Sequence, residues 1–212
     1  MENIWIAVPK LILSFFWFGL VFFLLIKFYK PIRNELMPKL TGFKALGIEF
    51  SFIKNSIDAA LELADKHPKW KVVVPEDARK NVLNRAKEHL DVFRNATILW
   101  IDDNPENNLN EWRMFLQLNV KIELAKSTEE ALEMLHQRKY DAVISDMARS
   151  NENDAGLKFL TKFQKVDETT AVIFYIGTYD PQMGKPLGAF GITNRPDELL
   201  HLVLDALERK KY

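Results

Sequence analysis

The carboxyl-terminal half of the chain predicts an α/β fold, a doubly wound parallel sheet of five strands. Short apolar runs alternate there with amphipathic segments of helical period, the pattern of repeated strand–helix–strand units. Two of these runs, residues 98–101 and 142–145, contain no charged side chain and end directly in aspartate. Uniformly apolar runs are typical of strands that are covered on both faces, as in a parallel sheet.

The individual elements follow one another at regular spacing. Ser127 before two glutamates is a good helix start, because a serine side chain caps free backbone N–H groups and acids favour the positive end of the helix dipole. Strands joined by such helices imply a flavodoxin-like order, with a crevice beyond the carboxyl ends of the strands. The predicted strands are 98–101, 120–124, 142–145, 171–176 and 189–192, and the predicted helices are 109–118, 128–138, 156–165 and 196–210.

The amino terminus predicts a membrane anchor. Residues 11–26 carry no charged side chain and are dense in Leu, Ile, Phe and Trp. Extended to residue 29, the segment would make roughly 28 Å of helix, close to the roughly 30 Å hydrocarbon core of a bilayer. A cleaved signal peptide is disfavoured because basic and aromatic residues, not small ones, follow the run. We expect one transmembrane helix within residues 1–30, in contact with lipid through residues 11–29.

The residues that flank this anchor predict its orientation. Basic residues follow the apolar run closely, whereas only one lysine precedes it. The positive-inside rule then places everything after residue 30 in the cytoplasm. The expected location is the cell inner membrane, with a single pass and a cytoplasmic carboxyl-terminal domain. The basic residues after the run are Lys27, Lys30, Arg33 and Lys39.

Charge is distributed unevenly along a chain whose net charge is zero. Residues 1–96 hold 15 basic and 10 acidic side chains, whereas residues 97–212 hold 14 basic and 19 acidic ones. The basic half suits an anionic membrane surface, and the acidic half argues against nucleic acid as a partner. The absence of cysteine excludes disulfides and Cys-ligated metals.

Residues 31–96 predict a cytoplasmic connector of mixed structure, with short strands and two helices. Apolar side chains alternate from Ile48 to Phe52 and lie among glycines, which favours a short strand or hairpin over 41–54. Helices are expected over 56–66 and from Pro75 to about residue 94.

One apolar stripe of this connector has two interpretations. Val82, Ala86, Leu90 and Phe93 recur every three or four residues. The stripe can pack on the following domain, which is the interpretation we favour. Alternatively, it forms a helical spacer that pairs with a second copy in a homodimer.

Acidic residues follow two of the predicted strands. Asp102 and Asp103 come directly after the first strand, and Asp146 follows the third. Since the carboxyl ends of parallel strands open onto one crevice, the three carboxylates are expected to lie together. Oxygen ligands of this kind suit a hard divalent cation.

Residues 97–210 resemble the receiver domain of bacterial response regulators. The resemblance rests on the three aspartates at the strand ends and on Arg195-Pro196 after the fifth strand. The resemblance implies that Asp102 and Asp103 are the family's metal-binding pair and that Asp146 is its phosphoacceptor. Arg195 stands where the family has a lysine. We therefore treat residues 97–212 as a receiver-like domain.

The resemblance also implies a chemistry and a partner. A phosphoryl group would pass from a phosphohistidine of a histidine kinase, or from another signalling protein, to the Asp146 carboxylate. Mg²⁺ would be held by Asp102, Asp103 and Asp146, with the backbone carbonyl of Ala148 as a further ligand. The protein would then be a phosphoacceptor in signal transduction and not a turnover enzyme.

The sequence departs from the family pattern at three places. Ile176 occupies the position where the family has a hydroxyl, so Thr178, two residues later, is the candidate for that role. Arg195 keeps the charge of the family's lysine without its compact ammonium group. The segment 179–188 contains two prolines and two glycines where the family has its fourth helix, which is therefore expected to be absent or reduced.

Other interpretations stay open. The domain could be a pseudo-receiver that binds a partner without phosphorylation, and the aspartates after the first strand could merely cap the next helix. A nucleotide-hydrolysing effector related to TIR domains would need a catalytic glutamate in the crevice, and Glu106 is the candidate. Arg149 could contact a phosphate or an acidic partner, or lie in a solvated loop.

Overall fold

The computed structural model divides the chain into two compact units, Met1–Glu49 and Phe50–Tyr212. The fold and the candidate site belong to the second unit. The residues that the structure describes are 17, 19–21, 23, 27, 37–66, 72–180, 182 and 184–211.

A parallel sheet of five strands forms the centre of the second unit, in the order β2-β1-β3-β4-β5. This order confirms the predicted flavodoxin-like arrangement, and each strand begins and ends within two residues of its predicted position. Strands β1, β3 and β4 are buried along almost their whole length, as their apolar sequences predict. The strands are β1 Thr97–Ile101, β2 Lys121–Ala125, β3 Ala142–Ser145, β4 Ala171–Tyr175 and β5 Gly191–Thr193.

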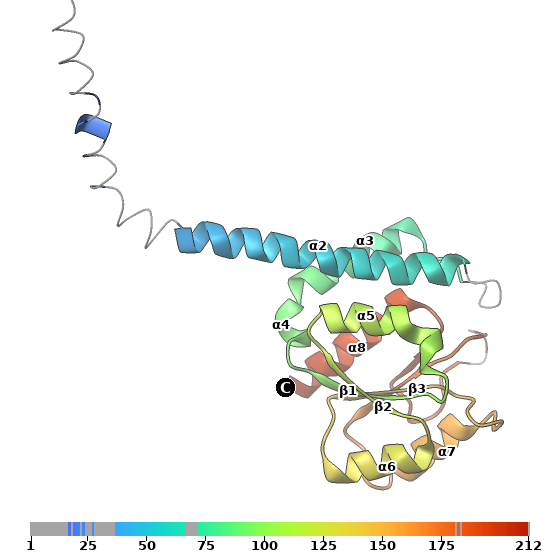
Figure 1. Cartoon of the computed structure of the whole chain (residues 1–212). Helices are drawn as coiled ribbons and strands as arrows, with labels where there is room; N and C mark the ends of the chain where they lie inside the picture. The colour runs from blue at the N-terminus through green and yellow to red at the C-terminus, as the bar shows by residue number, and fades with distance from the viewer. Residues whose placement is uncertain are drawn as a thin grey trace, which may run out of the picture. The chain divides into compact units, whose positions relative to one another are not determined.

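Helices cover both faces of this sheet. Helices α5 and α8 lie on one face, and α6 and α7 lie on the other (Figure 1). Each pair encloses its own apolar core against the sheet. A short 3-10 helix, η2, precedes α5 (Pro105–Asn108). The helices are α5 Leu109–Gln117, α6 Thr128–Gln137, α7 Ala155–Phe163 and α8 Pro196–Lys211.

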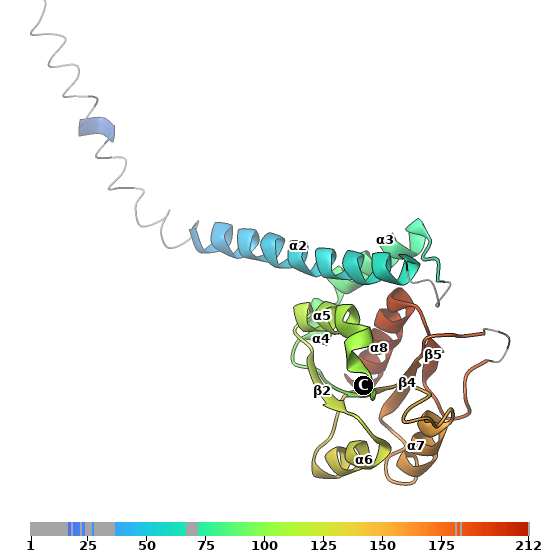
Figure 2. The same ribbon diagram turned by 45° about the vertical axis from the view of Figure 1, so that its right-hand side comes forward.

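The connection between β4 and β5 contains no α-helix among its described residues, 176–180, 182 and 184–190. The chain leaves the sheet there as an extended loop before it returns to β5 (Figure 2). Leu187 in this loop is 99% exposed. The prediction that the helix of this segment is absent is therefore confirmed for the residues described.

The predicted strand or hairpin over 41–54 is wrong. The structure has a single helix, α2, over Met37–Lys66. The alternating apolar residues from Ile48 to Phe52 suit a strand. The same stretch also begins an apolar stripe of helical spacing, which continues through Ile53 and Ile57. Ile53 and Ile57 of that stripe are buried, whereas Phe52 is 59% exposed. Helical spacing therefore decides which side chains are covered.

The second predicted connector helix is present as α3 (Glu76–Glu88) and α4 (Leu90–Phe93), interrupted at His89. Its apolar stripe packs within the chain, which confirms the favoured interpretation. Val82, Ala86 and Phe93 are fully buried in the same core as the apolar face of α8. Residues 50–66 of α2 join this core, so they form an additional layer together with α3 and α4 on the helices of one sheet face.

The predicted anchor, residues 1–30, lies almost entirely outside the described residues. Of the helices that the structure does describe, none combines the length and the apolar character needed to cross a bilayer.

Candidate metal and phosphoacceptor site

The three predicted aspartates lie together at the carboxyl ends of β1 and β3. These strands are adjacent and parallel, and Ile101 pairs with Ser145 at their last residues. Asp102 and Asp146 are the next residues of the two strands, so the pairing register brings them side by side. One carboxylate oxygen from each of Asp102, Asp103 and Asp146 lies within 4.8 Å of the other two. We call these three residues the acidic cluster.

Hydrogen bonds fix the two aspartates that follow β1. Asp102, only 3% exposed, accepts bonds from the Asn104 backbone N–H (2.8 Å) and from Asn108 Nδ2 (2.7 Å). Asp103 accepts bonds from Asn104 Nδ2 (2.9 Å) and from the Ser150 backbone N–H (2.7 Å). The loop after β1 and the loop after β3 therefore hold the carboxylates jointly.

These contacts bear on the capping interpretation of the aspartates. The residues at the N-cap positions of η2 and α5 are Asn104 and Asn108, not Asp102 or Asp103. Both aspartates instead turn toward Asp146. Helix capping therefore does not account for their position.

Asp146 is half-buried, and its surroundings oppose its charge. Its Oδ1 accepts a bond from the Met147 backbone N–H (2.7 Å). Burial raises the pKa of the Asp146 carboxyl to about 6, and the neighbouring Asp102 charge acts in the same direction. At neutral pH the cluster therefore concentrates negative charge that a cation would relieve.

The donor set of the acidic cluster fits Mg²⁺. Carboxylate oxygens are its preferred protein ligands, at about 2.1 Å, so opposite ligands stand roughly 4.2 Å apart. The separations of up to 4.8 Å in the cluster are close to that span. Each hydrogen-bonded oxygen keeps a second lone pair for a metal. The fourth predicted ligand, the backbone carbonyl of Ala148, belongs to an exposed residue of the same loop and stays a prediction.

Arg149 is not a solvated loop residue. It is 3% exposed, and its Nη1 donates to Ser145 Oγ (2.7 Å) and to the backbone carbonyl of Asp146. Its Nη2 donates to Thr128 Oγ1 at the start of α6 (3.1 Å). Burial lowers the pKa of the Arg149 guanidinium, and the charge of Asp146 opposes that effect. The predicted contact with a phosphate stays a prediction.

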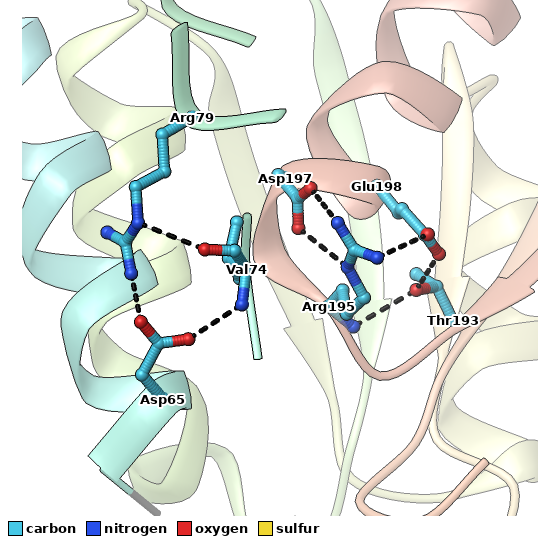
Figure 3. A network of polar contacts seen from close by, with 7 residues as sticks. All are labelled: Asp65, Val74, Arg79, Thr193, Arg195, Asp197 and Glu198. Atoms are coloured by element: carbon cyan, nitrogen blue, oxygen red, sulfur yellow. Dashed lines mark hydrogen bonds and ion pairs between the residues drawn. The ribbon is translucent and has the colours of Figure 1, made fainter. Parts of the chain in front are cut away.

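Arg195 lies in a separate polar network at the junction of β5 and α8 (Figure 3). Its guanidinium donates to both carboxylate oxygens of Asp197 (2.5 and 3.2 Å) and pairs with Glu198 at 3.3 Å. Its backbone N–H donates to Thr193 Oγ1 (3.0 Å). Among the described residues, none of its hydrogen bonds or ion pairs joins it to the acidic cluster.

The same view contains a second small network, in the connector. Asp65 of α2 accepts a bond from the Val74 backbone N–H (2.8 Å) and pairs with Arg79 of α3 (Figure 3). The Asp65 charge contributes to a raised pKa of Arg195, whose largest cause is the hydrogen bond to Asp197. The end of α2 therefore lies within electrostatic reach of the β5–α8 junction.

The remaining predicted site residues are not brought to the acidic cluster. Thr178 is exposed in the loop after β4, and no hydrogen bond within the described part of the chain joins it to the cluster. Glu106, the candidate of the nucleotide-hydrolysing alternative, is exposed in η2. Their proposed roles stay predictions.

One buried polar pair escaped the sequence analysis. Glu111 is 3% exposed on α5 and accepts a hydrogen bond from the Tyr175 hydroxyl at the end of β4 (2.9 Å). Burial raises the pKa of the Glu111 carboxyl. Tyr175 also packs edge-on against Trp100, at 6.1 Å between ring centroids. A glutamate in the first turn of a helix gave no sign of this, because such residues are ordinarily solvated.

Comparison with known families bears on the whole arrangement. Residues 98–193 match the model of the response regulator receiver domain. The match confirms the receiver-like interpretation of this part of the chain, which is somewhat less than half of it. It contains the acidic cluster and ends at the last residue of β5. No curated protein matches the chain.

Solved structures that resemble the receiver-like domain come from several bacteria. A response regulator receiver domain protein from Clostridium thermocellum is 25% identical, with 55% of this chain and 97% of that chain covered and a TM-score of 0.46. A two-component response regulator from Clostridium difficile is 21% identical, with 55% and 98% covered and a TM-score of 0.46. TrrA from Thermotoga maritima, in complex with Mg²⁺ and BeF, is 23% identical, with 52% and 98% covered and a TM-score of 0.45.

Proposed function

We propose that the receiver-like domain accepts a phosphoryl group on Asp146 and passes a signal on through its surface. The observation that carries this proposal is the acidic cluster, in which the half-buried Asp146 faces two aspartates from the neighbouring strand end. The match of residues 98–193 to the receiver domain supports the same chemistry. In this role the protein is a phosphoacceptor in two-component signalling and not a turnover enzyme.

The reaction forms one bond and breaks one. A carboxylate oxygen of Asp146 attacks the phosphorus of the donor, and the bond from phosphorus to the donor's leaving group breaks. With a phosphohistidine donor, the leaving group is a ring nitrogen of the imidazole. With acetyl phosphate, it is acetate. The product on Asp146 is an acyl phosphate, and water later hydrolyses it back to the carboxylate.

The protein's own residues prepare this step. The Met147 N–H holds one oxygen of the Asp146 carboxylate, and the loops fix Asp102 and Asp103 beside it. Mg²⁺ held by Asp102, Asp103, Asp146 and the Ala148 carbonyl would neutralise charge on the transferring group.

The remaining elements of the proposal concern partners and location. We propose a histidine kinase, or another phosphorylated signalling protein, as the donor. The uncharged run at 11–26 supports a single-pass anchor in the inner membrane, with residues 97–212 in the cytoplasm. A homodimer is a further candidate arrangement, and the acidic carboxyl-terminal half disfavours nucleic acid as a partner.

The test uses the purified full chain with acetyl phosphate and Mg²⁺. We expect the intact mass to rise by one phosphoryl group, and the modification to map to Asp146. The change should be absent in Asp146→Asn and when EDTA replaces Mg²⁺. Asp154→Asn is the matched control, since Asp154 is an exposed aspartate of the same loop outside the cluster, and it should be modified like the wild type.

A second measurement addresses the metal separately. Mg²⁺ titrated into the full chain should change the tryptophan fluorescence, because Trp100 lies two residues before Asp102. The response should be lost in Asp103→Asn. If Mg²⁺ binds but no donor modifies Asp146, the pseudo-receiver is the better description. If incubation with NAD leads to its turnover, the nucleotide-hydrolysing alternative replaces the proposal.

A further inference from the structure

A buried arginine contacts the backbone of the phosphoacceptor. Arg149 follows Asp146 by three residues in the loop after β3, and its guanidinium bonds back to the end of that strand. It contacts the last residue of β3, the backbone of Asp146 and the first turn of α6. Its Nε is buried and has no hydrogen-bond partner in the structure. The Arg149 Nε–H can therefore donate a hydrogen bond to one more acceptor.

Two other cations of the domain, Arg195 and Lys158, have acidic partners of their own. Arg195 is held by Asp197 and Glu198 at the β5–α8 junction (Figure 3). Lys158 pairs with Glu152 (3.0 Å) and Asp154 (3.1 Å) at the surface of α7. The charge of Arg149 acts on the Asp146 carboxylate and opposes the rise of its pKa.

We propose that Arg149 supplies the fixed positive charge that stabilises the phosphoryl group on Asp146, a task that Arg195 is not placed to perform. The inference rests on the proposed function and assigns the counter-charge of that same site. Arg149 is a positioning residue in the unmodified protein, since its Nη1 holds the backbone carbonyl of Asp146.

The physical reason is the charge that transfer adds. Conversion of a carboxylate into an acyl phosphate adds about one unit of negative charge at neutral pH. In a buried setting an opposite charge acts far more strongly than in water, because the effective dielectric constant is low. A guanidinium is always protonated and matches phosphate oxygens with several donors. Arg149 is already desolvated and oriented, so little reorganisation is needed when the charge appears.

The test separates charge from structure with two substitutions in the full chain. Arg149→Gln removes the charge but keeps a polar side chain that can donate a hydrogen bond, and Arg149→Lys keeps the charge. With acetyl phosphate and Mg²⁺, we expect the initial rate of Asp146 modification to fall at least about tenfold in Arg149→Gln. In Arg149→Lys it should stay within about threefold of the wild type. Lys158→Gln is the matched control, a surface cation of the neighbouring helix, and should resemble the wild type.

The Mg²⁺ affinity provides a readout that a merely structural role would not give. A neutral residue at position 149 removes one positive charge from the neighbourhood of the three aspartates, so Mg²⁺ binding should stay equal or tighten while modification slows. Parallel loss of metal binding and modification in Arg149→Gln would show that the residue only holds the loop together, and would overturn the proposal.

Three further results would also overturn it. One is a wild-type rate of Asp146 modification in Arg149→Gln. Another is a tenfold loss of that rate in a folded Arg149→Lys. This second result is decisive if Arg149→Gln does not fold. The third is a tenfold loss in Arg195→Gln with none in Arg149→Gln. If the wild-type chain itself takes no phosphoryl group, the proposed function fails first and the inference fails with it.

Discussion

Helix α2 is expected to stabilise the receiver-like domain although it lies outside the residues that match the family. The substitution that tests this is Ile57→Ala. Ile57 is fully buried, in the same core as the apolar faces of α3 and α8. The change removes three carbon atoms, worth about 2.4 kcal/mol of transfer free energy at about 0.8 kcal/mol each. A cavity adds to this, so the free energy of unfolding should fall by roughly 3 kcal/mol, within the usual range of about 2–5.

Thermal unfolding of the full chain, followed by circular dichroism, measures this loss. For a cooperative unit of the size of residues 50–212, it corresponds to a decrease in Tm of roughly 6–12 °C. Leu63→Ala is the control on the same helix, because Leu63 is 49% exposed, and it should change stability by less than about 1 kcal/mol. Equal stability of the two variants would refute the packing of α2 as part of the domain's core.

Three further predictions concern the site and its surroundings. Because the pKa of Asp146 is raised to about 6, the stability that its neutral form contributes is present at low pH and lost as the pH rises through 6. Asp146→Asn in EDTA should therefore be more stable than the wild type by about 1–2 kcal/mol at pH 7.5, after allowance for partial exposure. At pH 4 the two proteins should be equally stable. Urea unfolding at both pH values measures the difference, and a difference that does not change with pH would contradict the prediction. Glu111→Gln should likewise unfold at a higher urea concentration than the wild type once the pH exceeds the ordinary pKa of a glutamate, by a margin that grows up to the raised pKa of Glu111. Identical pH profiles would contradict the burial argument. Gly156→Ala should lose about 1–3 kcal/mol of stability and weaken Mg²⁺ binding, because a Cβ would lie 2.8 Å from the Asp146 carbonyl oxygen and 2.7 Å from a ring carbon of Phe174. Gly47→Ala on α2, where a Cβ meets nothing within 4 Å, should instead stabilise its helix by about 0.5–1 kcal/mol, and a similar gain in Gly156→Ala would count against the predicted clash.

The sheet and the acidic cluster could be predicted because burial on both faces leaves a direct trace in the sequence. Strands such as 98–101 and 142–145 must be apolar throughout, and the polar residue that follows each one marks the sheet edge. Adjacent parallel strands then bring Asp102 and Asp146 together without any further information. The loop between β4 and β5 was equally readable, since prolines and glycines exclude a regular helix.

Helix α2 could not be assigned in the same way. Its first half shows apolar residues at both strand and helix spacing, and local pattern does not separate the two. The stripe that includes Ile53 and Ile57 is buried because it packs against apolar residues of α3 and α8, which come later in the chain. Tertiary packing therefore decides this element, as it commonly overrides local preference.

The polar residues of the site show the same limit. Arg149 lies in a stretch of small and polar residues that reads as a solvated loop, and Glu111 lies in an ordinary first helical turn. Both are buried, and each is hydrogen-bonded to a residue at the end of a strand. Their partners, Ser145 and Tyr175, are single side chains at strand ends that no sequence motif marks.

The layer formed by α2, α3 and α4 has a consequence for self-association. One side of α8 faces the sheet, and its outer side is already occupied by α3, where Arg85 pairs with Asp205 and Glu208. A second copy cannot simply add to this surface; it would have to replace α3. Dimerisation through α8 is thus an exchange reaction, and its free energy includes the cost of displacing α3 from α8. Conditions that loosen α3 would favour a dimer of this kind, and any dimer that leaves the layer intact must use a different face.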